Sequence, residues 1–412
     1  MNTTNKIKLS SMMFLEFFIW GAWFVTLGTF LGTNLKASGA ETAAVFSTQS
    51  WGAIIAPFII GLIADRYFNA ERILGVLHLV GAFLMYQMYQ SSDLSSFYIY
   101  VFSYMVLYMP TLALVNSVAF NQMKDPEKEF SSIRVWGTIG WIVAGLSISY
   151  VFHWDSVESL ASGMLKNTFL LAGIAALVLG LLSFTLPATP PKVSDEKIKI
   201  GDIIGLDALK LLKDKNFAVF FISSILICIP LAFYYQNANP FLTESGLENP
   251  TGKMAIGQIS EALFLLLIPV FFTKYGFKKT ILVGMLAWAI RYALFAYGNG
   301  GELSFMLIIG IALHGICYDF FFVSGQIYTN SKAGDKYKSA AQGLITLATY
   351  GVGMLIGFAV AGWITDNYKT ATGTINWEMV WIIPAGIALA VFVLFALTFN
   401  DKNKRKFHTN FR

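Results

Sequence analysis

Apolar runs of about 20 residues recur along almost the whole of this 412-residue chain, and no other feature restricts its fold so strongly. A helical run of this length matches the hydrocarbon thickness of a bilayer. Only 13% of the residues are charged, whereas a soluble protein carries about a quarter. Because backbone polar groups in lipid need internal partners, the runs predict membrane-spanning α-helices. They are too long for the alternating strands of a membrane β-barrel.

The runs predict twelve spans in two groups of six. The expected spans are 10–32, 44–65, 72–90, 96–118, 133–152, 166–187, 216–238, 255–273, 279–297, 302–324, 339–363 and 376–399. We therefore predict an all-α membrane protein that has an N-terminal six-helix bundle (1–187), a cytoplasmic linker (188–215), a C-terminal six-helix bundle (216–400) and a basic cytoplasmic tail (401–412). Many secondary transporters have this six-plus-six layout, with a substrate site between the halves.

Lysine and arginine are distributed unequally between the two sides of the predicted spans. With twelve spans both termini lie on one side, which collects most of the basic residues. The opposite loops hold only Lys36, Lys166, Lys253 and Lys369. The positive-inside rule therefore places both termini in the cytoplasm. The net charge of +5 reflects this topology, so we expect contact with the lipid bilayer and no nucleic-acid partner. Within the linker, 203–213 has the apolar spacing of a short helix on the inner membrane surface.

Acidic residues inside the apolar runs are costly in lipid and mark pathways for substrates or protons. Glu261 follows Gln258 by three residues, so the two share a helix face. Asp319 follows Tyr318 in an aromatic cluster, and Glu16 lies in the first span. A carboxylate balanced between desolvation and a nearby cation can take up and release a proton. We expect Glu261, Asp319 or Glu16 to couple to protons; for Glu261 the alternative is a permanently paired, structural residue.

Two other segments offer groups that suit a polar ligand. Arg134, Thr138 and Trp141 are spaced to share one helix face, which presents a cation, a hydroxyl and an aromatic plate. Such a face fits a ligand with a planar ring, although Arg134 at the start of its span could instead reach the headgroups. In the seventh span, Tyr235 and Gln236 form a polar aromatic wall, near prolines that favour a local opening of the helix.

The remaining ionisable residues of the spans are expected to be structural. Arg291 is expected to pair with a carboxylate of its own half. His78 and His314 are lone histidines, and each is expected to be a packing residue rather than a proton relay. Cys228 and Cys317 both lie in predicted spans, which makes a structural disulfide or a metal site unexpected. A phosphate-binding glycine loop is missing too, so the chain is not expected to be an enzyme or to use a cofactor.

The loop after the second span resembles the signature loop of the major facilitator superfamily. Gly61, Asp65, Arg66 and Arg72 fit that pattern, whereas its second glycine and its adjacent basic pair are missing. Asp65 and Arg66 are therefore candidate gating residues, because an acid near a helix end can pair with a neighbouring bundle in one state only. The alternative is a loop that serves topology alone.

The chain as a whole resembles the nucleoside:proton symporter family, the bacterial nucleoside permeases within that superfamily. The matching stretches are Trp20–Trp23 with Thr26–Gly28, Tyr108–Leu112, Ile133–Gly140, Gln258–Glu261, Arg291–Gly298, Tyr318–Phe321 and Ala341–Gly343. They run through both halves in order, so the resemblance covers essentially the full length.

This resemblance implies a nucleoside bound between the halves. The family's binding positions fall at Arg134, Thr138 and Trp141 in the first half and at Gln258, Glu261, Tyr318 and Asp319 in the second. In the seventh span, however, an ungapped reading puts Ala232 and Tyr235 where the family has Gln and Asn, and Glu16 replaces a usual Gln. A sugar-like or modified-nucleoside substrate therefore stays open.

We predict a proton-driven importer of nucleosides that works by alternating access, as a monomer in a bacterial inner membrane. Its partners would be a nucleoside or similar solute, protons and lipid. One alternative is a proton symporter for another polar solute such as a sugar. Another is a sensor that binds a ligand on a transporter fold without carrying it across the membrane.

Overall fold

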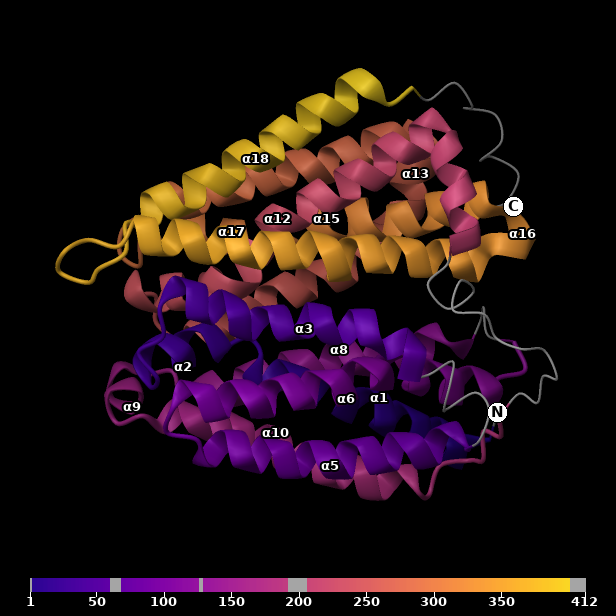
Figure 1. Ribbon diagram of the computed structural model, residues 1–412, viewed down its shortest axis with the longest axis horizontal. Helices are drawn as coiled ribbons and strands as arrows, with labels where there is room; N and C mark the ends of the chain where they lie inside the picture. Colours follow the sequence, from indigo (N-terminus) through magenta and orange to yellow (C-terminus); the bar gives the residue numbers. More distant parts are fainter. Residues whose placement is uncertain (1, 60–67, 126–128, 192–205, 401–412) are drawn as a thin grey trace. The chain divides into compact units, whose positions relative to one another are not determined.

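The computed structural model describes residues 2–59, 68–125, 129–191 and 206–400, and these are mostly helical (Figure 1). The chain forms two compact units. Unit 1 comprises Met1–Lys199 with Glu248–Ala255, and unit 2 comprises Ile200–Leu247 with Ile256–Arg412. Within the described residues, nine helical stretches are long and apolar enough to cross a membrane. The segments expected at 44–65 and 133–152 lie outside these nine, but both are largely helical.

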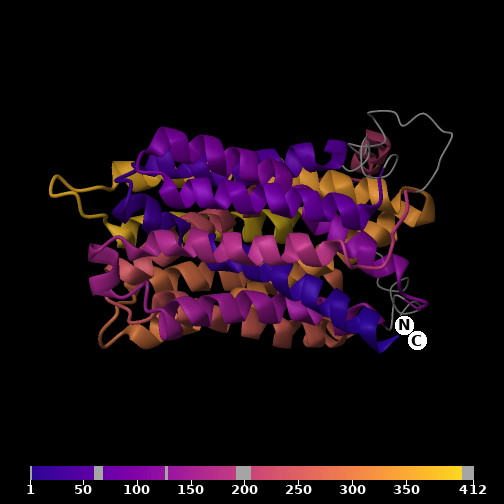
Figure 2. The ribbon, with the colours of Figure 1, turned by 90° about the horizontal axis from the view of Figure 1, so that it is seen from below.

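Unit 1 is built from helices that pack along their length. They are α1 (Thr3–Trp23), α2 (Leu27–Thr33), α3 (Gly39–Ile59), α5 (Ala70–Gln90), α6 (Leu94–Asn121), α8 (Ser131–Leu146), the π-helix η2 (Ser147–Val151), α9 (Val157–Ala161), the 3₁₀ helix η3 (Met164–Lys166) and α10 (Asn167–Ser183). Helix α1 packs on α8 and α10, α10 packs on α5, and α3 packs on α6. In Figure 2, most helices of unit 1, coloured indigo to magenta, lie with their long axes broadly along the horizontal.

Aromatic side chains fill the core of unit 1. The rings of Phe30 and Phe169 lie 4.7 Å apart between centroids, and Trp23 meets Tyr104 edge-on at 5.6 Å. All four side chains are buried. Edge-on aromatic pairs add roughly 0.5–1.5 kcal/mol beyond the area that they bury. This core holds α1 against α6 and α10. It thereby fixes the side chains that lie next to the polar residues of α1.

Unit 2 contains two long stretches that each join two predicted spans. Its elements are the 3₁₀ helix η4 (Leu206–Lys213), α12 (Lys215–Glu244), α13 (Pro250–Tyr297, whose first residues belong to unit 1), α14 (Ser304–Ala312), α15 (His314–Tyr318), the π-helix η5 (Asp319–Val323), α16 (Ser324–Thr346), the π-helix η6 (Leu347–Gly353), α17 (Met354–Asn367) and α18 (Trp377–Thr398). The backbone turns at Gly276 in α13 (φ 77°) and at Gly334 in α16 (φ 64°). These left-handed conformations favour glycine, which has no Cβ.

Helix α12 differs from the expectation in one respect. It runs without interruption from Lys215 to Glu244, with Pro230 and Pro240 inside it. The predicted local opening is therefore wrong for this structure. The Tyr292 hydroxyl donates a hydrogen bond to the Pro230 carbonyl at 2.6 Å, which ties α13 to α12 at the proline.

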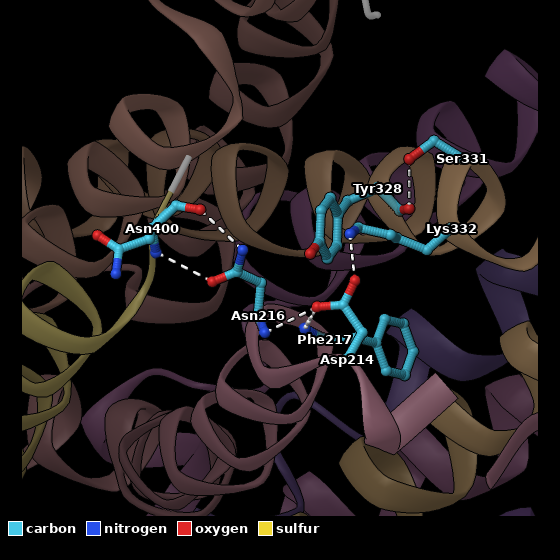
Figure 3. Close-up of polar contacts among 7 residues, drawn as sticks. All are labelled: Asp214, Asn216, Phe217, Tyr328, Ser331, Lys332 and Asn400. Carbon is cyan, nitrogen blue, oxygen red and sulfur yellow. Dashed lines mark hydrogen bonds and ion pairs between the residues drawn. The ribbon is translucent and has the colours of Figure 1, made fainter. Parts of the chain in front are cut away.

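The short helix expected at 203–213 is present as η4, and it packs on α12 and α16. Its Ala208 is buried with Ala333, Ala341 and Leu344 of α16, so part of its apolar surface faces protein. Beside it, Asp214 caps α12 by accepting the backbone N–H groups of Asn216 and Phe217 (Figure 3). The same carboxylate accepts from Lys332 at 2.5 Å, which ties the start of α12 to α16.

Candidate functional site

In unit 2, the candidate site is centred on Glu261 of α13, whose side chain is 30% exposed. Gly315 of α15 lets the two helices approach closely, because a Cβ there would lie 2.5 Å from the backbone carbon of Ser260. The Ser260 hydroxyl donates a hydrogen bond to the Ala312 carbonyl, which adds a second tie. This contact brings Glu261 Oε2 to 3.8 Å from His314 Nε2.

Arg291 determines which tautomer of His314 is present. It is fully buried, and its Nη1 lies 3.0 Å from His314 Nδ1. Because a guanidinium only donates, His314 Nδ1 must accept, and the ring proton is then on Nε2. The Nε2–H therefore faces the Glu261 carboxylate. Tyr234 completes the cluster, with its ring 3.7 Å from the guanidinium and 5.3 Å from the imidazole.

Asp319 is a second buried acid of unit 2. It begins the π-helix η5, and helices of this kind often lie at functional sites. Its side chain is 1% exposed, and its Oδ2 has no hydrogen-bond partner among the described residues. A carboxylate in an apolar helix bundle is costly without a partner, which marks Asp319 as a functional candidate.

The other predicted contacts of unit 2 lie in different environments. Gln258 and Tyr235 are half-buried, whereas Gln236 is buried with its amide atoms unpaired among the described residues. Tyr318 shares a hydrogen bond with the hydroxyl of Tyr350. Tyr350 also borders a small cavity of unit 2, whose polar lining is Ser224, Gln326, Gln342, Thr346, Thr349 and Tyr350. With about 30 Å³ it has room for water but not for a nucleoside.

In unit 1, Arg134, Thr138 and Trp141 are all half-buried on α8. The Arg134 guanidinium lies 4.1 Å from the centre of the Phe17 ring of α1. The Trp141 ring meets Trp20 of α1 edge-on at 5.6 Å. Both side chains therefore pack against the same neighbouring helix, and the structure brings the predicted cation and aromatic plate together along α8.

Glu16 of unit 1 lies in a buried polar cluster of its own. Its Oε2 is 2.8 Å from His78 Nε2 of α5, and its Oε1 accepts a hydrogen bond from the Thr111 hydroxyl of α6 at 2.5 Å. The Tyr108 hydroxyl donates to the Glu16 backbone carbonyl at 2.7 Å. Two neighbouring helices, α5 and α6, thus supply polar groups to the Glu16 carboxylate of α1.

Sequence reasoning missed the partners of the acids. His78 and His314 were both expected to be packing residues, yet each lies beside a glutamate of a different helix. Arg291 was expected to pair directly with a carboxylate, but its Nη1 meets His314 instead. A histidine inside an apolar run needs a polar partner, and that signal was present in the sequence. The candidate gating residues Asp65 and Arg66 lie outside the described residues.

Comparison with known proteins gives consistent matches over both units. The family description "Nucleoside H+ symporter" matches residues 1–404. A protein of Escherichia coli K12 named "Putative nucleoside transporter YegT" is 43% identical over 412 residues, or 98% of this chain and 95% of that protein. "Nucleoside permease NupG" of the same strain is 31% identical over 97% of each chain.

A solved structure extends the match to the fold. The crystal structure of nucleoside transporter NupG has a TM-score of 0.85 at 30% identity and covers 98% of this chain and 100% of that one. The predicted all-α membrane fold, of the major facilitator type, is confirmed by this likeness.

Proposed function

Since this chain belongs to the nucleoside H⁺ symporter family, we propose that it imports nucleosides together with protons by alternating access. Residues of both units bind the nucleoside: Arg134, Thr138 and Trp141 from unit 1, and Tyr235, Gln236, Gln258, Glu261, Tyr318 and Asp319 from unit 2. The observation that carries the proposal is the set formed by Glu261, His314 and Arg291. It supplies an acid, a neutral imidazole of known tautomer and a fixed cation inside a membrane helix bundle.

Proton coupling follows from the charges in this set. Without a proton, Glu261 and Asp319 are two carboxylates within the helices of unit 2, where the guanidinium of Arg291 contacts His314. A proton bound to either acid removes one of these two negative charges. Neutralisation lowers the cost of moving the buried groups through a dry state, so the loaded transporter changes conformation more easily than the unprotonated one.

The nucleoside is recognised by stacking and by polar contacts. Trp141 supplies a flat apolar surface for the base, and Thr138 and Arg134 supply hydrogen-bond donors one and two turns away, respectively, on α8. At the position where the family usually has Gln, Ala232 is fully buried, and its Cβ would meet a Cβ added at Gly357. We propose that this part of α12 contributes packing here, while Tyr235 and Gln236 contribute the polar contacts.

We also propose the location and orientation of the chain. It lies in a bacterial inner membrane, crosses it many times and keeps both termini in the cytoplasm. The Lys and Arg distribution supports this orientation. The same side holds the tie between Asp214 and Lys332, which joins α12 to α16 (Figure 3).

Transport into vesicles tests the proposal. Labelled uridine or adenosine should accumulate above the external concentration when the inside is more alkaline, and should only equilibrate without a pH gradient. Glu261→Gln should abolish accumulation, because it removes a proposed nucleoside contact as well as a proton site, whereas Glu158→Gln, on the exposed helix α9, should leave it unchanged. If a pH gradient drives the uptake of a sugar but of no nucleoside, the substrate is a sugar and the proposed substrate class is wrong. If nucleosides bind but are not carried across the membrane, the protein is a sensor.

A further inference from the structure

Glu16 is an acid that the coupling scheme above does not use. It is 0% exposed, and its neighbours His78 and Thr111 are 2% and 1% exposed. The carboxylate contacts one possible proton donor or acceptor, the His78 imidazole at 2.8 Å, and one hydroxyl donor, Thr111 at 2.5 Å. The cluster lies entirely within unit 1, on α1, α5 and α6.

Whether the cluster of Glu16 and His78 holds a proton depends on the ionisable groups around it. The ionisable groups around it are His78 from α5 and Tyr104 and Tyr108 from α6, while Arg134 of α8 lies against the Phe17 ring. Helix α10, which also packs on α1, contains no ionisable residue. With no proton on either partner, Glu16 and His78 together carry one negative charge in a dry interior. One bound proton makes the pair neutral, which removes the cost of an uncompensated charge in the apolar interior.

The cluster is connected to the proposed nucleoside site by direct contacts. Trp20 lies one turn after Glu16 on α1 and meets both Tyr108, at 5.7 Å, and Trp141, at 5.6 Å. Tyr108 in turn bonds to the Glu16 carbonyl. A change of charge on Glu16 therefore acts on the residues that hold the aromatic plate for the base. Packed side chains of this kind have few alternative arrangements and transmit small shifts.

We propose that Glu16 and His78 form a second proton-binding site, in unit 1, which loads one proton in each transport cycle. The inference rests on the proposed symport and adds to it a stoichiometry of two protons per nucleoside, one from each unit. The proton is shared between Glu16 Oε2 and His78 Nε2 and is exchanged when unit 1 opens to water.

The stoichiometry can be measured from the limit of nucleoside accumulation. With a pH gradient of about one unit and no membrane potential, two protons support roughly 100-fold accumulation and one proton roughly 10-fold. We expect the wild type near the first limit and Glu16→Gln near the second. A wild-type limit near 10-fold, or an unchanged limit in Glu16→Gln, would overturn the second site. Absence of any pH-driven accumulation in the wild type would instead reject the symport itself.

A second pair of variants tests the same proposal if Glu16→Gln does not fold. Thr111→Val removes the hydroxyl that stabilises the charged carboxylate, so the pH profile of nucleoside binding should move to higher pH. Thr168→Val is the matched control, because Thr168 is equally buried in unit 1 and its hydroxyl bonds only the Leu165 carbonyl. Profiles that coincide for the two variants would contradict the proposal.

Discussion

Asp155 Oδ2 accepts a hydrogen bond from the backbone N–H of Thr251 at 3.1 Å, although the two residues are 96 positions apart. The same oxygen accepts from the Ser149 hydroxyl at 2.5 Å, and that hydroxyl accepts the N–H of Gly252 at 2.7 Å. Two of the N–H groups that the start of α13 leaves unpaired are thus capped by residues at the end of the fifth predicted span. These bonds lie within unit 1, to which Glu248–Ala255 belongs.

Asp155→Asn should weaken the attachment of α13 to unit 1. Asparagine keeps one acceptor but loses the charge that favours a helix N-terminus, so we expect a loss of about 1–3 kcal/mol. The measurement is thermal unfolding of the detergent-purified protein. Asp93→Asn is the control, because Asp93 caps α6 in an exposed position and should matter less. Equal losses in the two variants would show that burial adds nothing to the Asp155 contact.

Gly252→Ala should disturb the same contact by steric overlap. A Cβ at Gly252 would lie 2.5 Å from Cε2 of Tyr150 and 2.9 Å from Cβ of Ser149. Such overlap in a packed region costs about 1–3 kcal/mol, and we expect slower nucleoside uptake together with a lower melting temperature. A Cβ at Gly386 of α18 meets no atom within 4 Å. Gly386→Ala should therefore be neutral or slightly stabilising, and a similar loss there would point to a general helix effect.

Trp141→Ala should weaken nucleoside binding. Stacking of a base on an aromatic side chain contributes about 1–3 kcal/mol, which corresponds to a Kd roughly 5 to 150 times higher when the ring is removed. Trp136 lies on the same helix but is 42% exposed, so Trp136→Ala should leave the Kd unchanged. Isothermal titration of purified protein with a nucleoside compares the two. A normal Kd in Trp141→Ala would remove this residue from the site.

The tie between Asp214 and Lys332 predicts a loss of stability in acid. Burial raises the pKa of Asp214, but the hydrogen bond from Lys332, the backbone N–H bonds and the Lys332 charge together hold that pKa below its ordinary value of 3.8. A carboxyl whose pKa is lower in the folded state stabilises it above the ordinary value, and this contribution is lost as the pH falls through the folded-state value. Since Asp214 is partly exposed, we expect a modest effect.

Melting temperatures between about pH 3 and pH 6 test this expectation. The difference in melting temperature between wild type and Asp214→Asn should be largest above about pH 4 and should disappear in more acidic buffer. Glu158→Gln, which changes an exposed carboxylate of α9, should keep the wild-type slope. If this difference in melting temperature grows as the pH falls, the pKa of Asp214 is not lowered in the folded state and the prediction is wrong.

Some features of the fold could be predicted because they depend on local sequence. Membrane-length apolar runs and the helix breaks near Gly276 and Gly334 were readable along the chain. The shared face of Arg134, Thr138 and Trp141 also follows from helical periodicity. The uninterrupted course of α12 was missed, because its packing on α17 and α18 depends on tertiary contacts that local sequence does not show.

The sequence by itself determined that this chain is a helical membrane protein and which family it resembles, because lipid requires long apolar helices and the motifs run through both halves. Only the tertiary structure decided which partner each buried charge has. Glu16 meets His78, and Glu261 meets a His314 whose tautomer Arg291 sets. These partners lie on different helices, and periodicity tells which face of a helix is polar but not which neighbour that face meets.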